Sequence, residues 1–134
     1  METLTLEFDG GSRGNPGPAG IGVVVRAADG TPLVTLGRYI GKATNNVAEY
    51  RALIAGLEAA SATPSRAVKV RGDSKLVIEQ VAGRWKVKQE HLRPLHAEVT
   101  EALRHLGSWS IRHVRRGENE RADELLNEAL DAAS

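Results

Sequence analysis

Two aspartates of this chain are candidate catalytic residues, because each follows a stretch of alternating apolar residues. Asp9 follows an alternating apolar pattern at residues 4–8, and Asp73 stands just beyond a second one at residues 68–70. Such alternation is typical of half-buried strands, so both carboxylates are expected at the carboxyl ends of strands. Residues 10–20 are rich in glycine and leave the backbone open to a large ligand. Taken alone, Asp9 and its glycines could instead form only a turn.

Two further acids are expected at the beginnings of helices. Glu49 falls in the first turn of a helix predicted over residues 45–61, and Asp123 in the first turn of one predicted over residues 119–132. Each of them alone could simply favour the positive end of a helix dipole. In sheets with helix-linked parallel strands, however, ligands bind beyond the carboxyl ends of the strands. Two strand ends and two helix beginnings can meet at such a point.

Four carboxylates at one point repel one another unless cations lie between them. Oxygen ligands without histidine or thiolate favour Mg²⁺, with Mn²⁺ as an alternative, over Zn²⁺. Two such ions are a standard means of in-line displacement at phosphorus, in which one activates water and the other stabilises the leaving oxygen. The residue types therefore predict a site for two Mg²⁺ ions in a phosphodiester hydrolase.

The periodicity of the apolar residues predicts an α/β domain around these acids. Strands are expected at residues 4–8, 21–25, 33–40, 68–70 and 109–113, and helices at residues 45–61, 74–81, 92–106 and 119–132. Asn45 or Asn46 is expected to cap the first helix. Gly83 and Gly107 are expected to end the second and third helices. This order predicts a five-stranded mixed sheet, with three antiparallel strands and then two parallel ones, flanked by helices.

Length and composition narrow the class of protein. The 134 residues fit a single domain, residues 1–134, and the absence of cysteine excludes thiolate metal sites and disulfides. No stretch resembles a secretion signal or a membrane span, and we expect a soluble, cytoplasmic monomer. The net charge of +1 does not by itself indicate a nucleic acid partner. Basic runs at residues 84–88 and 112–116 are usually just solvated faces.

Four ordered blocks give the chain a close resemblance to the type 1 ribonuclease H family, from Leu4 to about Ala132. The blocks are Asp9-Gly10-Gly11-Ser12 with Gly14-Asn15-Pro16-Gly17, Thr44-Asn45-Asn46-Val47-Ala48-Glu49-Tyr50, Gly72-Asp73-Ser74, and Asn119-Glu120-Arg121-Ala122-Asp123-Glu124-Leu125. The resemblance implies a ribonuclease H-like fold and an endonuclease that cuts the RNA strand of an RNA/DNA hybrid, leaving 5′-phosphate and 3′-hydroxyl ends. The family's four acidic metal ligands match Asp9, Glu49, Asp73 and Asp123. Because all four are present, the resemblance implies an active enzyme.

The resemblance also implies contacts with the substrate. Gly11, Ser12 and Asn15 would meet the 2′-hydroxyl groups of the RNA strand, which distinguish RNA from DNA in a minor groove. Thr44 and Asn45 are implied toward the DNA strand, with Lys42 as a phosphate ligand. Asn46 is implied near the junction of the two grooves. These polar residues could otherwise be ordinary formers of turns and caps.

Two departures from the family pattern are visible. The long basic insertion of tightly binding members is reduced here to residues 83–89, where Trp85 could either stack on the DNA backbone or belong to the core. The histidine-bearing loop before the last helix is replaced by the short residues 115–118. His113 is expected to lie within a strand and to be structural. Arg116 is then the nearest group able to help the product leave.

Two other functions stay open at this point. A transposase or Holliday-junction resolvase domain of the same general architecture would also use strand-end acids and Mg²⁺. The block at residues 44–50 and the lack of a DNA-targeting extension argue against it. A non-catalytic module that binds RNA/DNA hybrids is the second alternative, and the presence of all four acids argues against that one.

Overall fold

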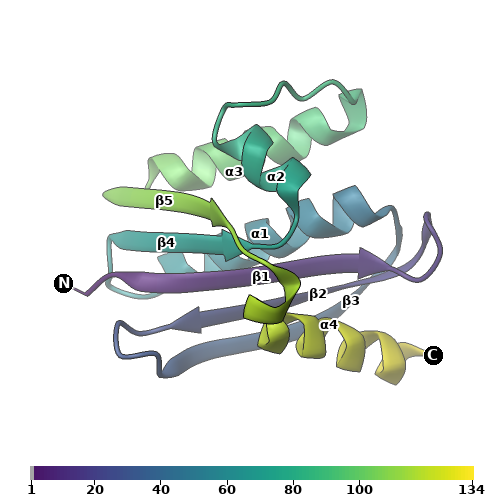
Figure 1. Ribbon diagram of the computed structural model, residues 1–134, viewed down its shortest axis with the longest axis horizontal. Coiled ribbons are helices and arrows are strands. Elements are labelled where there is room, and N and C mark those ends of the chain that lie inside the picture. The colour runs from purple at the N-terminus through teal and green to yellow at the C-terminus, as the bar shows by residue number, and fades with distance from the viewer. Residues whose placement is uncertain (1) are drawn as a thin grey trace.

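The computed structural model describes residues 2–134 and shows a mixed sheet with helices on both faces (Figure 1). The strands are β1 (Leu4–Ser12), β2 (Gly17–Arg26), β3 (Pro32–Ala43), β4 (Ala67–Gly72) and β5 (Ser108–His113). They lie in the order β3-β2-β1-β4-β5. Strands β1, β2 and β3 pair antiparallel, whereas β4 is parallel to both β1 and β5. The expected mixed sheet is confirmed.

Helices lie on both faces of the sheet and at one edge. Figure 1 shows α1 (Asn45–Ser61) and α3 (Arg93–Arg104) behind the strands, α2 (Lys75–Val81) beyond β5 at the edge of the sheet, and α4 (Glu120–Ala133) in front. Helix α1 packs on β1 and β2, where Leu6 and Phe8 are fully buried in the core. Short 3-10 turns, Glu90–Leu92 and Arg116–Glu118, precede α3 and α4.

Glycines on β2 and β3 allow α4 to lie close against the sheet. A Cβ atom at Gly22 would overlap the carbonyl oxygen of Ala122, and one at Gly37 would lie 2.6 Å from that of Leu125. Side chains at these two positions would push α4 away from the strands. Because α4 also carries Asp123, these glycines help to set the position of an acid.

Strand β1 is longer than the sequence predicts, so Asp9 lies inside the strand and not at its tip. Residues 10–12 continue to pair with β2, with Gly10 opposite Ile21 and Ser12 opposite Ala19. The pairing of β1 with β4 ends earlier, at Phe8 opposite Gly72. Asp9 therefore stands one residue beyond the end of the parallel pairing, on a strand that the hairpin with β2 extends.

Three further expectations about the helices need correction. Helix α1 spans residues 45–61 as predicted, but Thr44 is its cap, since the Oγ1 atom accepts a hydrogen bond of 3.2 Å from the backbone N–H of Val47. Glu49 consequently lies in the second turn of α1. Helix α3 ends at Arg104 and not at Gly107, whose N–H donates to the carbonyl of Arg66 as β5 begins.

Within residues 2–134, no helix combines the length and apolar character needed to cross a bilayer.

Candidate active site

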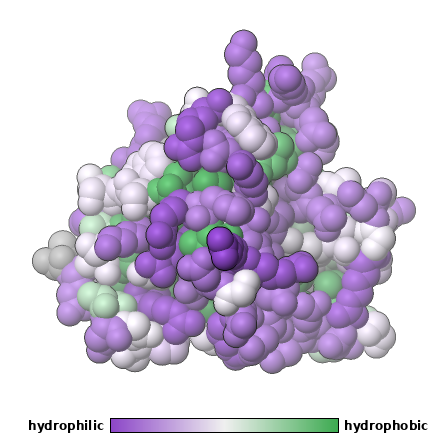
Figure 2. Space-filling model, viewed as in Figure 1, coloured by the Kyte–Doolittle hydropathy of each residue, from purple (hydrophilic) through white to green (hydrophobic). Residues whose placement is uncertain are grey.

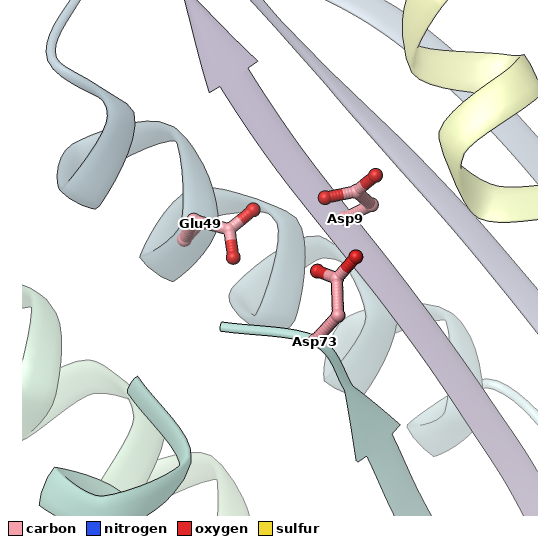
Figure 3. A group of neighbouring side chains, drawn as sticks. All are labelled: Asp9, Glu49 and Asp73. Atoms are coloured by element: carbon pink, nitrogen blue, oxygen red, sulfur yellow. The ribbon is translucent and has the colours of Figure 1, made fainter. Parts of the chain in front are cut away.

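Three carboxylates from three separate segments meet at the carboxyl end of β4. Asp9 comes from β1, Glu49 from α1 and Asp73 from the residue after β4, and one oxygen of each lies within 4.8 Å of the others. Figure 3 shows the three side chains gathered around one point between β1, α1 and the end of β4. They line an open cavity of about 580 Å³, and Asp123, in the first turn of α4, lines it too. Three of the four acids predicted to meet at one point thus do so, and the fourth, Asp123, lines the same cavity outside that group.

Gly10 brings α1 and its glutamate against β1. A Cβ atom at this position would overlap the carbonyl oxygen of Ala48, so only glycine permits so close an approach. The N–H of Gly10 donates a hydrogen bond to Oε1 of Glu49. Strand β1 thus orients the carboxylate that α1 carries.

Asn119 ties the beginning of α4 to the same strand. The side-chain Nδ2 of Asn119 is buried and donates a hydrogen bond of 2.9 Å to the carbonyl of Phe8. One turn along, the N–H of Asp123 donates to the carbonyl of Asn119 at 3.2 Å. The sequence alone does not reveal Asn119 as a positioning residue, because an asparagine before a helix usually signals a cap. Here it makes no such side-chain cap.

Burial and mutual repulsion make it unfavourable to ionise this cluster. Burial, and then the charges of Glu49 and Asp73, raise the pKa of Asp9 to about 10. Burial raises the pKa of Glu49 to about 7, against the lowering effect of the hydrogen bond from Gly10. Burial also raises the pKa of Asp73, while the charge of Arg116 opposes that shift. Among the described residues, Oδ2 of Asp9 is buried without a hydrogen-bond partner. Such a set of oxygens suits a divalent cation.

The tip of the β1–β2 hairpin is joined to the beginning of α1 by polar side chains. Oδ1 of Asn45 accepts a hydrogen bond of 2.8 Å from the N–H of Ser12. Oδ1 of Asn15 accepts one of 3.1 Å from the N–H of Asn45. Ser12, Asn15 and Asn45 thus form one connected rim, although the resemblance implies contacts with two different strands of the substrate.

The other residues expected at the substrate lie at different distances from the acids. Gly11, Ser12, Asn45, Asn46 and Arg116 line the same cavity as the carboxylates. Lys42 is exposed on β3, and the hydroxyl group of Thr44 caps α1. Trp85 is 45% exposed and lines a neighbouring cavity that shares Asn46, so it is not a core residue.

His113 lies in β5 as predicted, but its surroundings differ from those of a buried structural residue. The side chain is exposed and lines the acidic cavity. Its Nε2 atom lies 3.3 Å from the carbonyl oxygen of Asp73. Alternation alone could not reveal this exposure, since it does not tell which strand lies at the edge of the sheet.

Comparison with known proteins agrees with this geometry. The model of the family described as "Reverse transcriptase-like" matches residues 7–129. The ribonuclease HI of Halobacterium salinarum is 51% identical over 126 residues, which cover 94% of this chain and 63% of that protein. The chain belongs to the ribonuclease H family. It spans only 36% of the length of three further curated relatives, from mycobacteria, at 48% identity.

Solved structures of ribonucleases H share the fold closely. The crystal structure of RNase H1 from Halobacterium salinarum superposes with a TM-score of 0.94 at 48% identity, covering 97% of this chain and 98% of that one. LC11-RNase H1 in complex with an RNA/DNA hybrid superposes with a TM-score of 0.92 at 42% identity and the same coverage. The ribonuclease H-like fold expected from the resemblance is therefore confirmed.

Proposed function

We propose that this chain is an endoribonuclease that hydrolyses the RNA strand of RNA/DNA hybrids and leaves 5′-phosphate and 3′-hydroxyl ends. The observation that carries the proposal is the meeting of Asp9, Glu49 and Asp73 within 4.8 Å, in an open cavity that Asp123 also lines. The names of the relatives and the hybrid bound by LC11-RNase H1 support the choice of substrate.

The four acids are proposed to hold two Mg²⁺ ions when substrate is bound, with Mn²⁺ as an alternative. The donor set fits hard cations, because it consists of carboxylate oxygens, one of which is buried without a hydrogen-bond partner among residues 2–134. When bound, the ions supply an activated water and stabilise the leaving oxygen. The chain's own contribution is the hydrogen bond from the N–H of Gly10, which favours the ionised form of Glu49.

The rim around the cavity is proposed to bind the two strands of the hybrid. Gly11, Ser12 and Asn15 would contact 2′-hydroxyl groups of the RNA, which is how a protein recognises RNA at a minor groove. The hydrogen bonds that Ser12 and Asn15 make with Asn45 hold this part of the rim in place. On the DNA side, the proposed contacts are those of Lys42, Thr44 and Asn45, with Trp85 stacking nearby. Asn46 is proposed to lie near the junction of the two grooves.

Arg116 is proposed to hold the phosphate of the product. It lines the acidic cavity and its charge acts on Asp73. A guanidinium group stays charged at neutral pH, so it can bind a phosphate but cannot carry a proton. We further propose that residues 1–134 act as one catalytic domain, as a monomer, and in the cytoplasm.

Cleavage of labelled duplexes tests the proposal. The RNA strand of a hybrid should be cut in Mg²⁺, whereas the DNA strand and duplex DNA should stay intact, and duplex RNA serves as a comparison. Asp73→Asn should abolish cleavage while the fold and hybrid binding are kept, because the amide preserves the volume but weakens the cation site. Cutting of duplex DNA would instead indicate a transposase-like or resolvase-like nuclease. Binding of the hybrid without cleavage would indicate a non-catalytic module.

A further inference from the structure

The side of β4 and β5 that faces away from α1 carries three cations, here called the β4–β5 cationic face. Along β4, Val68 and Val70 are buried in the core, so Lys69 and Arg71 stand on the opposite side of the sheet. Arg112 of β5 lies beside Arg71 in the parallel register. Helix α4 packs on β1, β2 and β3, and Figure 1 shows β4 and β5 uncovered toward the viewer.

The charges of this face are not neutralised by nearby carboxylates. The ion pairs among residues 2–134 include none formed by Lys69, Arg71 or Arg112. Glu7, which lies opposite Arg71 in the register of β1 and β4, instead forms an ion pair of 3.0 Å with Arg26. A shallow groove of about 480 Å³ lies between the three cations. Figure 2, drawn in the same view, shows this side of the molecule as mostly hydrophilic.

The placement of the cations suits the phosphates of an extended nucleic acid strand. Alternate residues of a β-strand are separated by about 6.6 Å, which matches successive phosphates of a stretched single strand better than a flat lipid surface. Arg71 stands two residues before Asp73, so the cationic face begins about 7 Å from the acids and extends to about 13 Å at Lys69. A strand leaving the cavity could therefore continue directly onto it.

We propose that the β4–β5 cationic face binds the phosphates of a single-stranded extension attached to the hybrid. This inference rests on the proposed function for the identity of the attached duplex, but the binding of a single strand does not depend on cleavage. Its consequence is a preference for hybrids that end in an unpaired tail over hybrids with blunt ends.

The test compares the double variant Lys69→Gln, Arg112→Gln with a control double variant, Arg38→Gln, Arg51→Gln. The control removes the same charge from exposed side chains that border a different groove, between β3, α1 and α3. Fluorescence anisotropy measures the binding of a labelled 12-nucleotide single strand to the full chain, over a range of salt concentrations. Steady-state kinetics then compare blunt hybrids with hybrids that carry a single-stranded tail at either end.

The wild type and the control should bind the single strand, and the Lys69 and Arg112 variant should bind it about ten-fold more weakly. The slope of log affinity against log salt should fall by about 1.4 for the two lost phosphate contacts. Of the two hybrids that carry a tail, one should show a higher KM with this variant than with the wild type. For the blunt hybrid, the kcat and KM of the variant should equal those of the wild type. Equal single-strand binding by the two variants would overturn the inference. Binding of the face to anionic vesicles but not to single strands would also overturn it. Failure of the wild type to cut blunt hybrids would count against the proposed function alone.

Discussion

Replacing Asp9 by asparagine is expected to stabilise the metal-free protein while it destroys activity. Folding buries this carboxyl beside Glu49 and Asp73, and burial, followed by the charges of these two neighbours, raises its pKa to about 10. The folded protein therefore takes up a proton at Asp9 that the unfolded chain does not hold at neutral pH. An amide of the same size needs no proton and can donate a hydrogen bond to the neighbouring carboxylate of Glu49.

The size of the effect follows from the raised pKa. Above pH 3.8, the ordinary pKa of an aspartate, the folded protein must keep Asp9 protonated. For each further pH unit this lowers the unfolding free energy of the wild type by up to about 1.4 kcal/mol. At pH 7.5 the upper limit is roughly 5 kcal/mol, and since water enters the open cavity we expect a gain of about 1–3 kcal/mol for Asp9→Asn. For a chain of this length, each kcal/mol of added unfolding free energy raises the melting temperature by about 3–5 °C.

Urea denaturation in EDTA at pH 5.0 and pH 7.5 measures this gain. A carboxyl with a raised folded-state pKa loses stability as the pH rises from about 4 toward 10, so the advantage of the variant should be larger at pH 7.5. Asp131→Asn is the control, because Asp131 is exposed and its one ion pair among residues 2–134 is with the exposed Arg13. Its effect should stay within about 0.5 kcal/mol. A destabilised Asp9→Asn protein, or a gain that does not grow with pH, would refute the argument.

Three further predictions follow from the site. Asn119→Ala should lower the unfolding free energy by about 1–3 kcal/mol in urea denaturation, since it removes the buried hydrogen bond to Phe8, and should reduce kcat by displacing Asp123; unchanged kcat would separate Asn119 from the site. Arg116→Ala should lower turnover without changing the shape of the pH–rate profile, whereas His113→Ala should change stability little because the side chain is exposed; an altered profile in the Arg116 variant would contradict this. Millimolar Mg²⁺ should raise the melting temperature of the wild type, and an unchanged melting curve would mean that the acids do not form one cation site.

The parts of the site that the sequence predicted well are those where local pattern and fold agree. Asp73 was placed correctly because the alternation of Val68 and Val70 defines β4 and the chain turns directly after Gly72. The side chain of Ser74 then caps α2. Both features are encoded within a few residues, so they need no knowledge of the neighbouring strands.

The parts that the sequence did not predict depend on tertiary contacts. Residues 10–12 carry almost no side chain, so no alternation marks them, and only their pairing with β2 makes them part of β1. Thr44 and Asn45 both have the chemistry of a cap, and the choice of Thr44 leaves Asn45 free to bind Ser12. The role of Asn119 lies in a contact with Phe8, 111 residues away in the sequence.

The convergence of the acids is set more by the backbone of β1 than by the acids themselves. The carbonyl of Phe8 holds α4 through Asn119, and the N–H of Gly10 holds Glu49 of α1. These two contacts flank Asp9, so a three-residue stretch of one strand fixes both helices that bring acids to the site. Four carboxylates that repel one another could not assemble this arrangement on their own. The hydrogen bonds of the strand and the space left by Gly10 assemble it instead, and the cations they make room for would relieve the repulsion.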